Sequence, residues 1–74
     1  MNNVYIAYCE NDFVFLSFTV LNEIYDDCIV FELSFTDFSK YNILDFIHSN
    51  NTENDMNNFL CGHHIKYNTE YYGM

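Results

Sequence analysis

The sequence predicts an α+β fold in which a three- to four-stranded antiparallel sheet carries one or two short helices on one face, in the order β-β-β-α-α-β. Two patterns predict it: apolar and polar residues alternate in the first half, and apolar residues recur every three to four positions in the second. The 74 residues suit a single compact acidic domain, residues 1–74. Hydrophobic residues make up 50% of the chain and aromatic residues 20%, which provides a core for so small a domain.

Three β-like segments in the first half predict a three-stranded antiparallel meander. Residues 4–9 are mostly β-branched or aromatic and alternate between two faces. Residues 10–12 follow as a polar turn that contains Asn and Asp. Residues 28–35 show the clearest alternation in the chain, as expected for a strand. The side chains of this strand that we expect on the core face are Ile29, Phe31, Leu33 and Phe35.

The second strand, residues 13–21, determines which aromatic side chains we expect to be exposed. Its core-facing residues are Val14, Leu16, Phe18 and Val20. Phe13 and Phe15 then lie on the opposite face, and Tyr5 and Tyr8 lie on opposite faces of the first strand. Because helices in so short a chain cover only one sheet face, some of these aromatic side chains should be exposed. Such a patch usually marks an interface with a second copy or with another protein.

The period of the pattern changes at residue 36 and predicts a helix. Thr36, Asp37 and Ser39 are all favourable N-cap residues, and residues 49–51 end the helix. The apolar positions of this helix are Phe38, Tyr41, Leu44 and Ile47, with Ile43 and Phe46 beside them. This spacing indicates one helix that packs on the sheet.

A second, shorter helix begins at Thr52, which forms a capping box with Asp55 three residues later. Its apolar stripe consists of Met56, Phe59 and Leu60. Gly62 occupies the position C′ that often follows a helix. Residues 63–67 alternate again and predict a fourth strand, after which residues 68–74 form a tail.

Charge is the most informative part of the composition. Eleven Asp and Glu residues stand against two lysines and no arginine, so the formal net charge is −9. Such a charge repels nucleic acids and anionic membranes, which excludes both as direct ligands, and it attracts basic surfaces. Alternatively, the carboxylates only keep an aromatic-rich protein soluble. The chain has only two lysines, Lys40 and Lys66, but eleven asparagines, although the two residue types use similar codons. This difference suggests that cationic residues are selected against.

The three cysteines, Cys9, Cys28 and Cys61, do not show the even number and spacing of a disulfide framework. The first residues lack the basic region and apolar core of a signal peptide, and no apolar run reaches the length of a membrane span. We therefore expect free thiols and a cytoplasmic protein, in the host cytoplasm if a phage encodes it.

The densest group of potential metal ligands is Cys61, His63 and His64. Their spacing does not match the paired ligands of structural zinc sites, and adjacent residues of a strand point to opposite faces. No nucleophile motif or glycine-rich phosphate loop is present. We expect no metal, no cofactor and no enzymatic activity, and zinc binding by these three residues is the alternative.

In size, acidity, aromatic content and lack of a catalytic motif, the whole chain resembles phage-encoded anti-defence proteins such as anti-CRISPR proteins and anti-restriction DNA mimics. The resemblance implies a non-enzymatic inhibitor that occupies a basic nucleic-acid-binding surface, for example on a nuclease. The residues that we expect to contact such a partner are Glu23, Tyr25, Asp26, Asp27, Glu53 and Asp55. The alternative is a small homodimeric interaction or regulatory module, such as an antitoxin-like protein or an accessory subunit, that uses an exposed aromatic sheet face.

Overall fold

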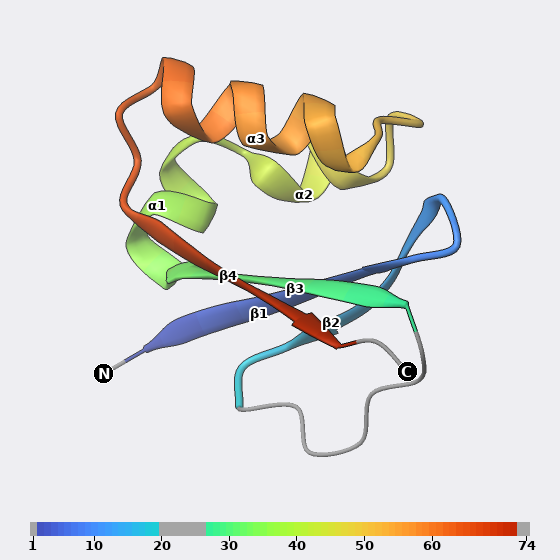
Figure 1. Cartoon of the computed structure of the whole chain (residues 1–74). Helices are drawn as coiled ribbons and strands as arrows, with labels where there is room; N and C mark the ends of the chain where they lie inside the picture. The colour runs from blue at the N-terminus through green and yellow to red at the C-terminus, as the bar shows by residue number, and fades with distance from the viewer. Residues whose placement is uncertain (1, 20–26, 73–74) are drawn as a thin grey trace.

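A four-stranded antiparallel sheet with three short helices on one face makes up this computed structural model, which describes residues 2–19 and 27–72 (Figure 1). The strands are β1 (Asn3–Cys9), β2 (Asp12–Ser17), β3 (Cys28–Ser34) and β4 (Tyr67–Tyr72). The helices are α1 (Phe35–Lys40), α2 (Ile43–Ile47) and α3 (Glu53–Gly62). The predicted α+β class, with helices over one face of an antiparallel sheet, is confirmed. None of the helices in the described ranges is long and apolar enough to cross a membrane.

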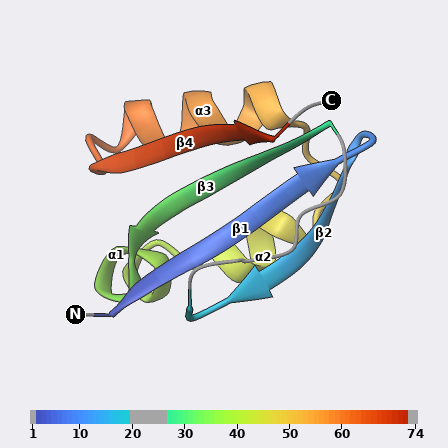
Figure 2. The ribbon, with the colours of Figure 1, turned by 60° about the horizontal axis from the view of Figure 1, so that its bottom comes forward.

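The strand order β2-β1-β3-β4 places β1 and β3 in the centre of the sheet (Figure 2). β3 pairs with β1 along its whole length and not with β2, so the predicted meander is wrong. β1 takes a central position because it is apolar on both faces. Val4 and Ile6 are fully buried on the helix-facing side, and Ala7 is fully buried on the other.

The pairing of β2 with β1 contains a β-bulge at Val14. Tyr8 pairs with Phe13 and Ala7 pairs with Phe15, so β2 has one extra residue, Val14, between the two pairs. The bulge turns Phe13 to the helix-facing side, where its ring centroid lies 4.6 Å from that of Tyr8. The prediction that Phe13 lies on the opposite, open face is therefore wrong. The Phe15 side chain lies outside the described part of the structure.

Several residues predicted on the core face of β2 are exposed. Val14 is 47% exposed, Leu16 is 43% exposed, and Phe18, just after the strand, is 62% exposed. They are exposed because β2 is an edge strand and α2, the helix that lies beside it, has only five residues. Val20 lies outside the described residues.

The predicted first helix is two helices, α1 and α2. The N-cap is Ser34, whose Oγ accepts a hydrogen bond from the Asp37 amide, so the helix begins before the predicted caps at Thr36, Asp37 and Ser39. Between the two helices Asn42 adopts a left-handed conformation with a φ of 54°. Asn tolerates this conformation better than most residues, and it redirects the chain after α1.

The start of α3 is as predicted. Thr52 Oγ1 accepts a hydrogen bond from the Asp55 amide, and the Asp55 carboxylate accepts one from the Thr52 amide. The capping box is therefore confirmed. Met56 and Leu60 are fully buried against the sheet, as their helical spacing predicts.

The C-terminal end of α3 lies two residues beyond the predicted end. Gly62 is the last helical residue, and His64 occupies the left-handed position with a φ of 57°. The amides of His64 and Ile65 donate to carbonyls of the last helical turn, as in a Schellman motif. This turn displaces the fourth strand, so the prediction of a strand at residues 63–67 is wrong. The tail instead supplies the edge strand β4, from Tyr67 onwards.

Candidate protein-binding surface

Three carboxylates from distant parts of the chain meet at the end of the sheet where β1 turns into β2. Glu10 lies in the β1–β2 turn, Asp27 immediately precedes β3, and Glu53 is the first residue of α3. They line a hollow of about 360 Å³, which we call the acidic hollow. The other residues that line it are Tyr8, Asn11, Ile29 and Tyr71.

Two of these carboxylates stand on backbone conformations that residues other than glycine adopt rarely. Glu10 and Asn11 have φ values of 51° and 68°, as a type I′ turn in a two-residue hairpin loop requires. Asp27 has a φ of 60°. Each such conformation costs about 1 kcal/mol, and such residues often lie at functional sites. The hollow thus combines acidic side chains with strained backbone conformations, which the pairing of the neighbouring strands must stabilise.

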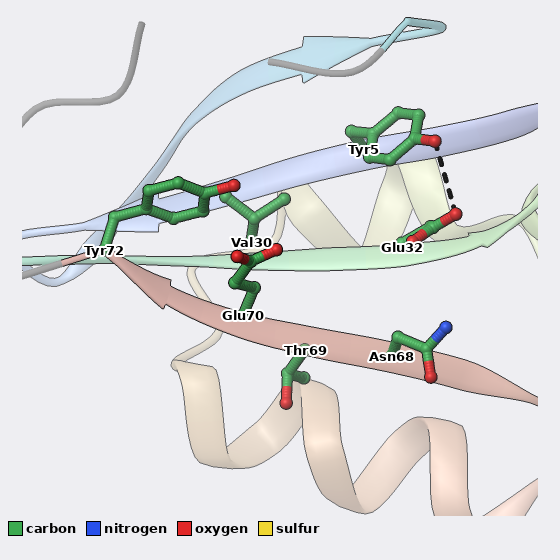
Figure 3. A pocket seen from close by; sticks show the side chains of 7 residues that line it. All are labelled: Tyr5, Val30, Glu32, Asn68, Thr69, Glu70 and Tyr72. Atoms are coloured by element: carbon green, nitrogen blue, oxygen red, sulfur yellow. Dashed lines mark hydrogen bonds between the residues drawn. The ribbon is translucent and has the colours of Figure 1, made fainter. Parts of the chain in front are cut away.

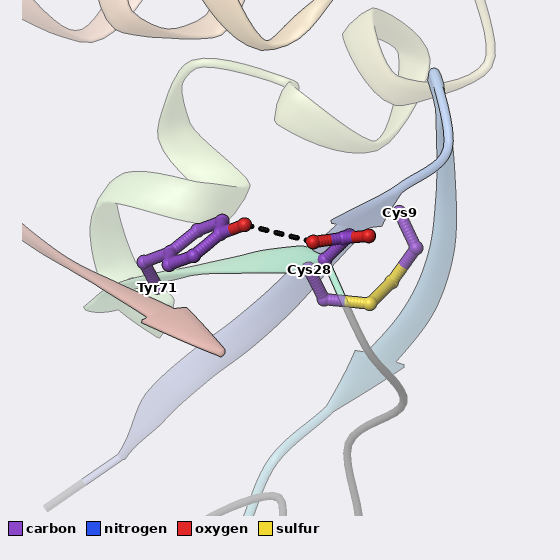
Figure 4. Close-up of a disulfide and its surroundings, with 4 residues drawn as sticks. Cys9, Cys28 and Tyr71 are labelled. Carbon is purple, nitrogen blue, oxygen red and sulfur yellow. Dashed lines mark hydrogen bonds between the residues drawn. A yellow bond between two sulfur atoms is a disulfide. The ribbon is translucent and has the colours of Figure 1, made fainter. Parts of the chain in front are cut away.

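Tyr71 of β4 adds a phenol to the acidic hollow. Its Oη donates a hydrogen bond to Asp27 Oδ1 at 2.9 Å (Figure 4). This hydrogen bond and the negative charge of Asp27 raise the pKa of Tyr71 above its usual value of 10.0. Tyr71 is 64% exposed, so its ring is available for contact with a partner.

The structure places two of the six predicted partner contacts, Asp27 and Glu53, in the acidic hollow. Asp55 does not line it, because its carboxylate accepts a hydrogen bond from the Thr52 amide at the start of α3. The other three, which lie outside the described residues, are Glu23, Tyr25 and Asp26.

Glu10 and Tyr71 belong to the acidic hollow although neither is one of the six predicted contact residues. The position of Glu10 in a polar turn next to Asn11 was a usable indication of exposure. The sequence indicates Tyr71 only as an aromatic residue suited to anchoring a partner, and its place in the hollow follows from the pairing of β4 with β3.

The hydrogen-bonded carboxylates of the described residues accept from neutral donors. Glu32 Oε2 accepts from Asn3 Nδ2 at 2.7 Å and from Tyr5 Oη at 3.2 Å. Asp45 Oδ2 accepts from Asn42 Nδ2 at 2.9 Å. Neutral donors stabilise a carboxylate without cancelling its charge. The negative charge of these groups is therefore available to a partner.

A disulfide joins Cys9 of β1 to Cys28 of β3 (Figure 4). The two cysteines are opposite each other in the register of the central strands, with their Cα atoms 4.3 Å apart. The expectation of free thiols is wrong for this pair, because the strand order that joins them was not predicted. Cys61 is free and exposed.

The three potential ligands at the end of α3 occupy different surroundings. The ring of His63 packs against that of Phe59 at 4.6 Å, and His64 forms the left-handed turn after the helix. Cys61 Sγ lies 3.5 Å from Tyr67 Oη. Over residues 2–19 and 27–72, no group of three or more His, Cys, Asp or Glu side chains is placed to hold a metal ion.

An exposed apolar strip lies between β2 and α2. It consists of Val14, Leu16 and Leu44, each between 43% and 47% exposed. With their neighbours they line a pocket of about 200 Å³. Those neighbours are Phe13, Ile47 and His48.

Comparisons with known proteins do not assign a function to either surface. No protein-family model, curated protein or solved structure matches this chain.

Proposed function

We propose that this chain is a non-enzymatic inhibitor that binds a basic, nucleic-acid-binding surface of another protein, such as a nuclease. Its carboxylates take the places that the target offers to phosphates. The composition favours an anti-defence protein of a phage or mobile element, of the anti-CRISPR or anti-restriction type. The acidic hollow carries this proposal, because it presents Glu10, Asp27 and Glu53 together at one end of the sheet.

Three properties of the chain support the proposal. The carboxylates of the hollow come from a hairpin turn, the residue before a strand and the start of a helix, so regular elements adjoin each of them. The net charge of −9 attracts a basic surface over a distance and accelerates association. The exposed ring of Tyr71 beside Asp27 offers the kind of aromatic contact that often dominates binding energy.

Competition with DNA tests the proposal. The immobilised chain is incubated with a bacterial lysate at low ionic strength, and a captured basic protein is purified. Its affinity for the chain is then measured at rising salt, with and without duplex DNA. We expect the affinity to fall steeply with salt and DNA to displace the chain. An affinity that salt does not change, or a complex that DNA leaves intact, contradicts the proposal.

Paired charge-neutralising variants locate the contact. The double variant Glu10→Gln, Glu53→Gln should weaken binding at least about tenfold, because it removes two carboxylates from the hollow. The control is Asp37→Asn, Asp45→Asn, which changes the net charge equally but affects α1 and α2 outside the hollow. Equal weakening by the two double variants would mean that only total charge matters.

The second candidate function is a homodimeric interaction or regulatory module, and the exposed apolar strip favours it. Val14, Leu16 and Leu44 would be removed from water by a second copy at the β2 edge. This strip differs from the predicted aromatic sheet face, which loses Phe13 because that side chain packs against the core. Light scattering after gel filtration tests this function: it requires a dimer that persists at high salt and that Leu16→Lys converts to a monomer.

A further inference from the structure

The sheet face that carries no helix has a pocket of about 350 Å³ across its central and edge strands (Figure 3). The rings of Tyr5 and Tyr72 stand at its two ends, and Val30 lies between them. Glu32 and Glu70 supply two carboxylates. We call this the tyrosine–glutamate pocket, and its remaining lining residues are Asn68 and Thr69.

Strand register explains why these side chains meet. Tyr5 of β1 is paired with Glu32 of β3, and Val30 of β3 is paired with Glu70 of β4. Tyr72 follows two residues after Glu70 and so lies on the same face. Val30 is only 6% exposed and forms an apolar floor. The pocket therefore combines two aromatic walls, an apolar floor and two acids.

Hydrogen bonds and packing fix part of the pocket in advance. Glu32 Oε2 accepts hydrogen bonds from Asn3 and Tyr5, which orients the carboxylate and the phenol. The Glu70 carboxylate interacts in the same way with the Tyr72 hydroxyl, and a carboxylate has lone pairs for further donors from a ligand. Tyr72 packs against the buried cluster that contains the disulfide.

We propose that the tyrosine–glutamate pocket binds an arginine side chain of a basic protein partner. A guanidinium is planar, stacks on aromatic rings and donates hydrogen bonds to carboxylates in a fork. Its aliphatic stem suits the floor formed by Val30. A lysine ammonium is compact and strongly hydrated, so it gains less from contact with an aromatic ring. The assignment rests on the proposed function and names the residue type that this face of the protein recognises.

The electrostatics of the pocket agree with a cationic occupant. Burial, followed by the charge of Glu32, raises the pKa of Tyr5 above 10.0, and burial, followed by the charge of Glu70, raises that of Tyr72. Both phenols are therefore neutral at neutral pH. The charge in the pocket is that of the two glutamates, and the chain as a whole also attracts cations.

Titration of the full chain with short peptides, followed by NMR of the tyrosine rings, tests this assignment. The probes are acetyl-Gly-Arg-Gly-amide, the same peptide with Lys, and the same peptide with citrulline, which is uncharged but similar in shape. We expect saturable shifts of the Tyr5 and Tyr72 rings with the Arg peptide. The Lys peptide should bind at least about threefold more weakly than the Arg peptide, and the citrulline peptide should give no shift.

Variants separate the pocket from general acidity. Glu70→Gln and Tyr72→Leu should each weaken the Arg peptide about three- to tenfold, with the amide spectrum showing an intact fold. The control is Asp45→Asn, which alters charge equally on the helix-covered side and should leave the affinity unchanged. If Asp45→Asn weakens binding as much as Glu70→Gln does, the assignment is overturned.

Other outcomes also decide the question. Ring shifts elsewhere than Tyr5 and Tyr72, equal binding of Arg and Lys peptides, or tighter binding of spermidine would each overturn the assignment. If the pocket fails but a basic protein is still displaced by DNA, the proposed function stands alone. If the Arg peptide binds while no DNA-displaceable partner is found, the pocket stands and the proposed function fails.

Discussion

Tyr67, the first residue of β4, donates a hydrogen bond from its Oη to Oδ1 of Asn57 on α3 at 2.8 Å. The Tyr67 ring also stacks on that of Phe31 in the core, with the centroids 6.2 Å apart. These contacts tie the edge strand to both the helices and the central sheet. They also position two binding surfaces, because β4 supplies Tyr71 to the acidic hollow and Glu70 and Tyr72 to the tyrosine–glutamate pocket.

We expect Tyr67 to make stability depend on pH in the alkaline range. Hydrogen bonding to Cys61, followed by burial and the charge of Cys61, raises the pKa of Tyr67 from 10.0 to about 12. The folded state therefore holds the phenol proton more tightly than the unfolded chain does. This contribution is complete below pH 10.0 and is lost as the pH rises to about 12. Urea unfolding across this pH range should show that Tyr67→Phe loses less free energy of unfolding than the wild type does. Equal losses in the two proteins would contradict the prediction.

Reduction of the Cys9–Cys28 disulfide should lower the free energy of unfolding by about 3 kcal/mol, because it releases a cross-link between residues 19 apart. Urea unfolding with and without reductant measures the change. Cys61→Ser serves as the control and should respond to reductant as the wild type does, since Cys61 is free. Thiol titration of oxidised protein should find one reactive cysteine, and finding three would refute the pairing.

His64→Gly should stabilise the protein by about 0.5–1 kcal/mol. His64 has a φ of 57°, where a side chain is strained and glycine is not, and this gain exceeds the extra flexibility of glycine in the unfolded chain. His63→Gly is the matched control. His63 has an ordinary φ of −96°, so this substitution should destabilise the protein. Thermal unfolding of both variants is decisive, and a loss of stability in His64→Gly would be inconsistent with this geometry.

Asp55 should act in folding and not in partner binding. Thr52→Ala and Asp55→Ala each remove one half of the capping box and should cost about 1 kcal/mol in urea unfolding. In the competition assay Asp55→Ala should leave the affinity for the basic partner closer to wild type than Glu53→Ala does. A larger effect of Asp55→Ala on affinity would restore it as a contact.

The sequence by itself determined those features that depend on near neighbours. Alternation in residues 28–35 placed Ile29, Phe31 and Leu33 on the core face, and they are buried or partly buried there. The same prediction was wrong for Phe35, which begins α1 and is 41% exposed. The capping box of α3 was readable because Thr52 and Asp55 are only three residues apart. The α+β class followed from the change in period between the two halves of the chain.

Tertiary structure decided which distant segments became neighbours. Periodicity shows which face a residue occupies, but it does not show which strand lies beside it, since that choice depends on how well whole segments bury one another. The pairing of β1 with β3 joined Cys9 to Cys28 and completed the tyrosine–glutamate pocket. The same arrangement brought Glu10, Asp27 and Glu53 together, and no local pattern relates these three residues. The acidity was evident in the sequence, whereas its arrangement into two surfaces required the fold.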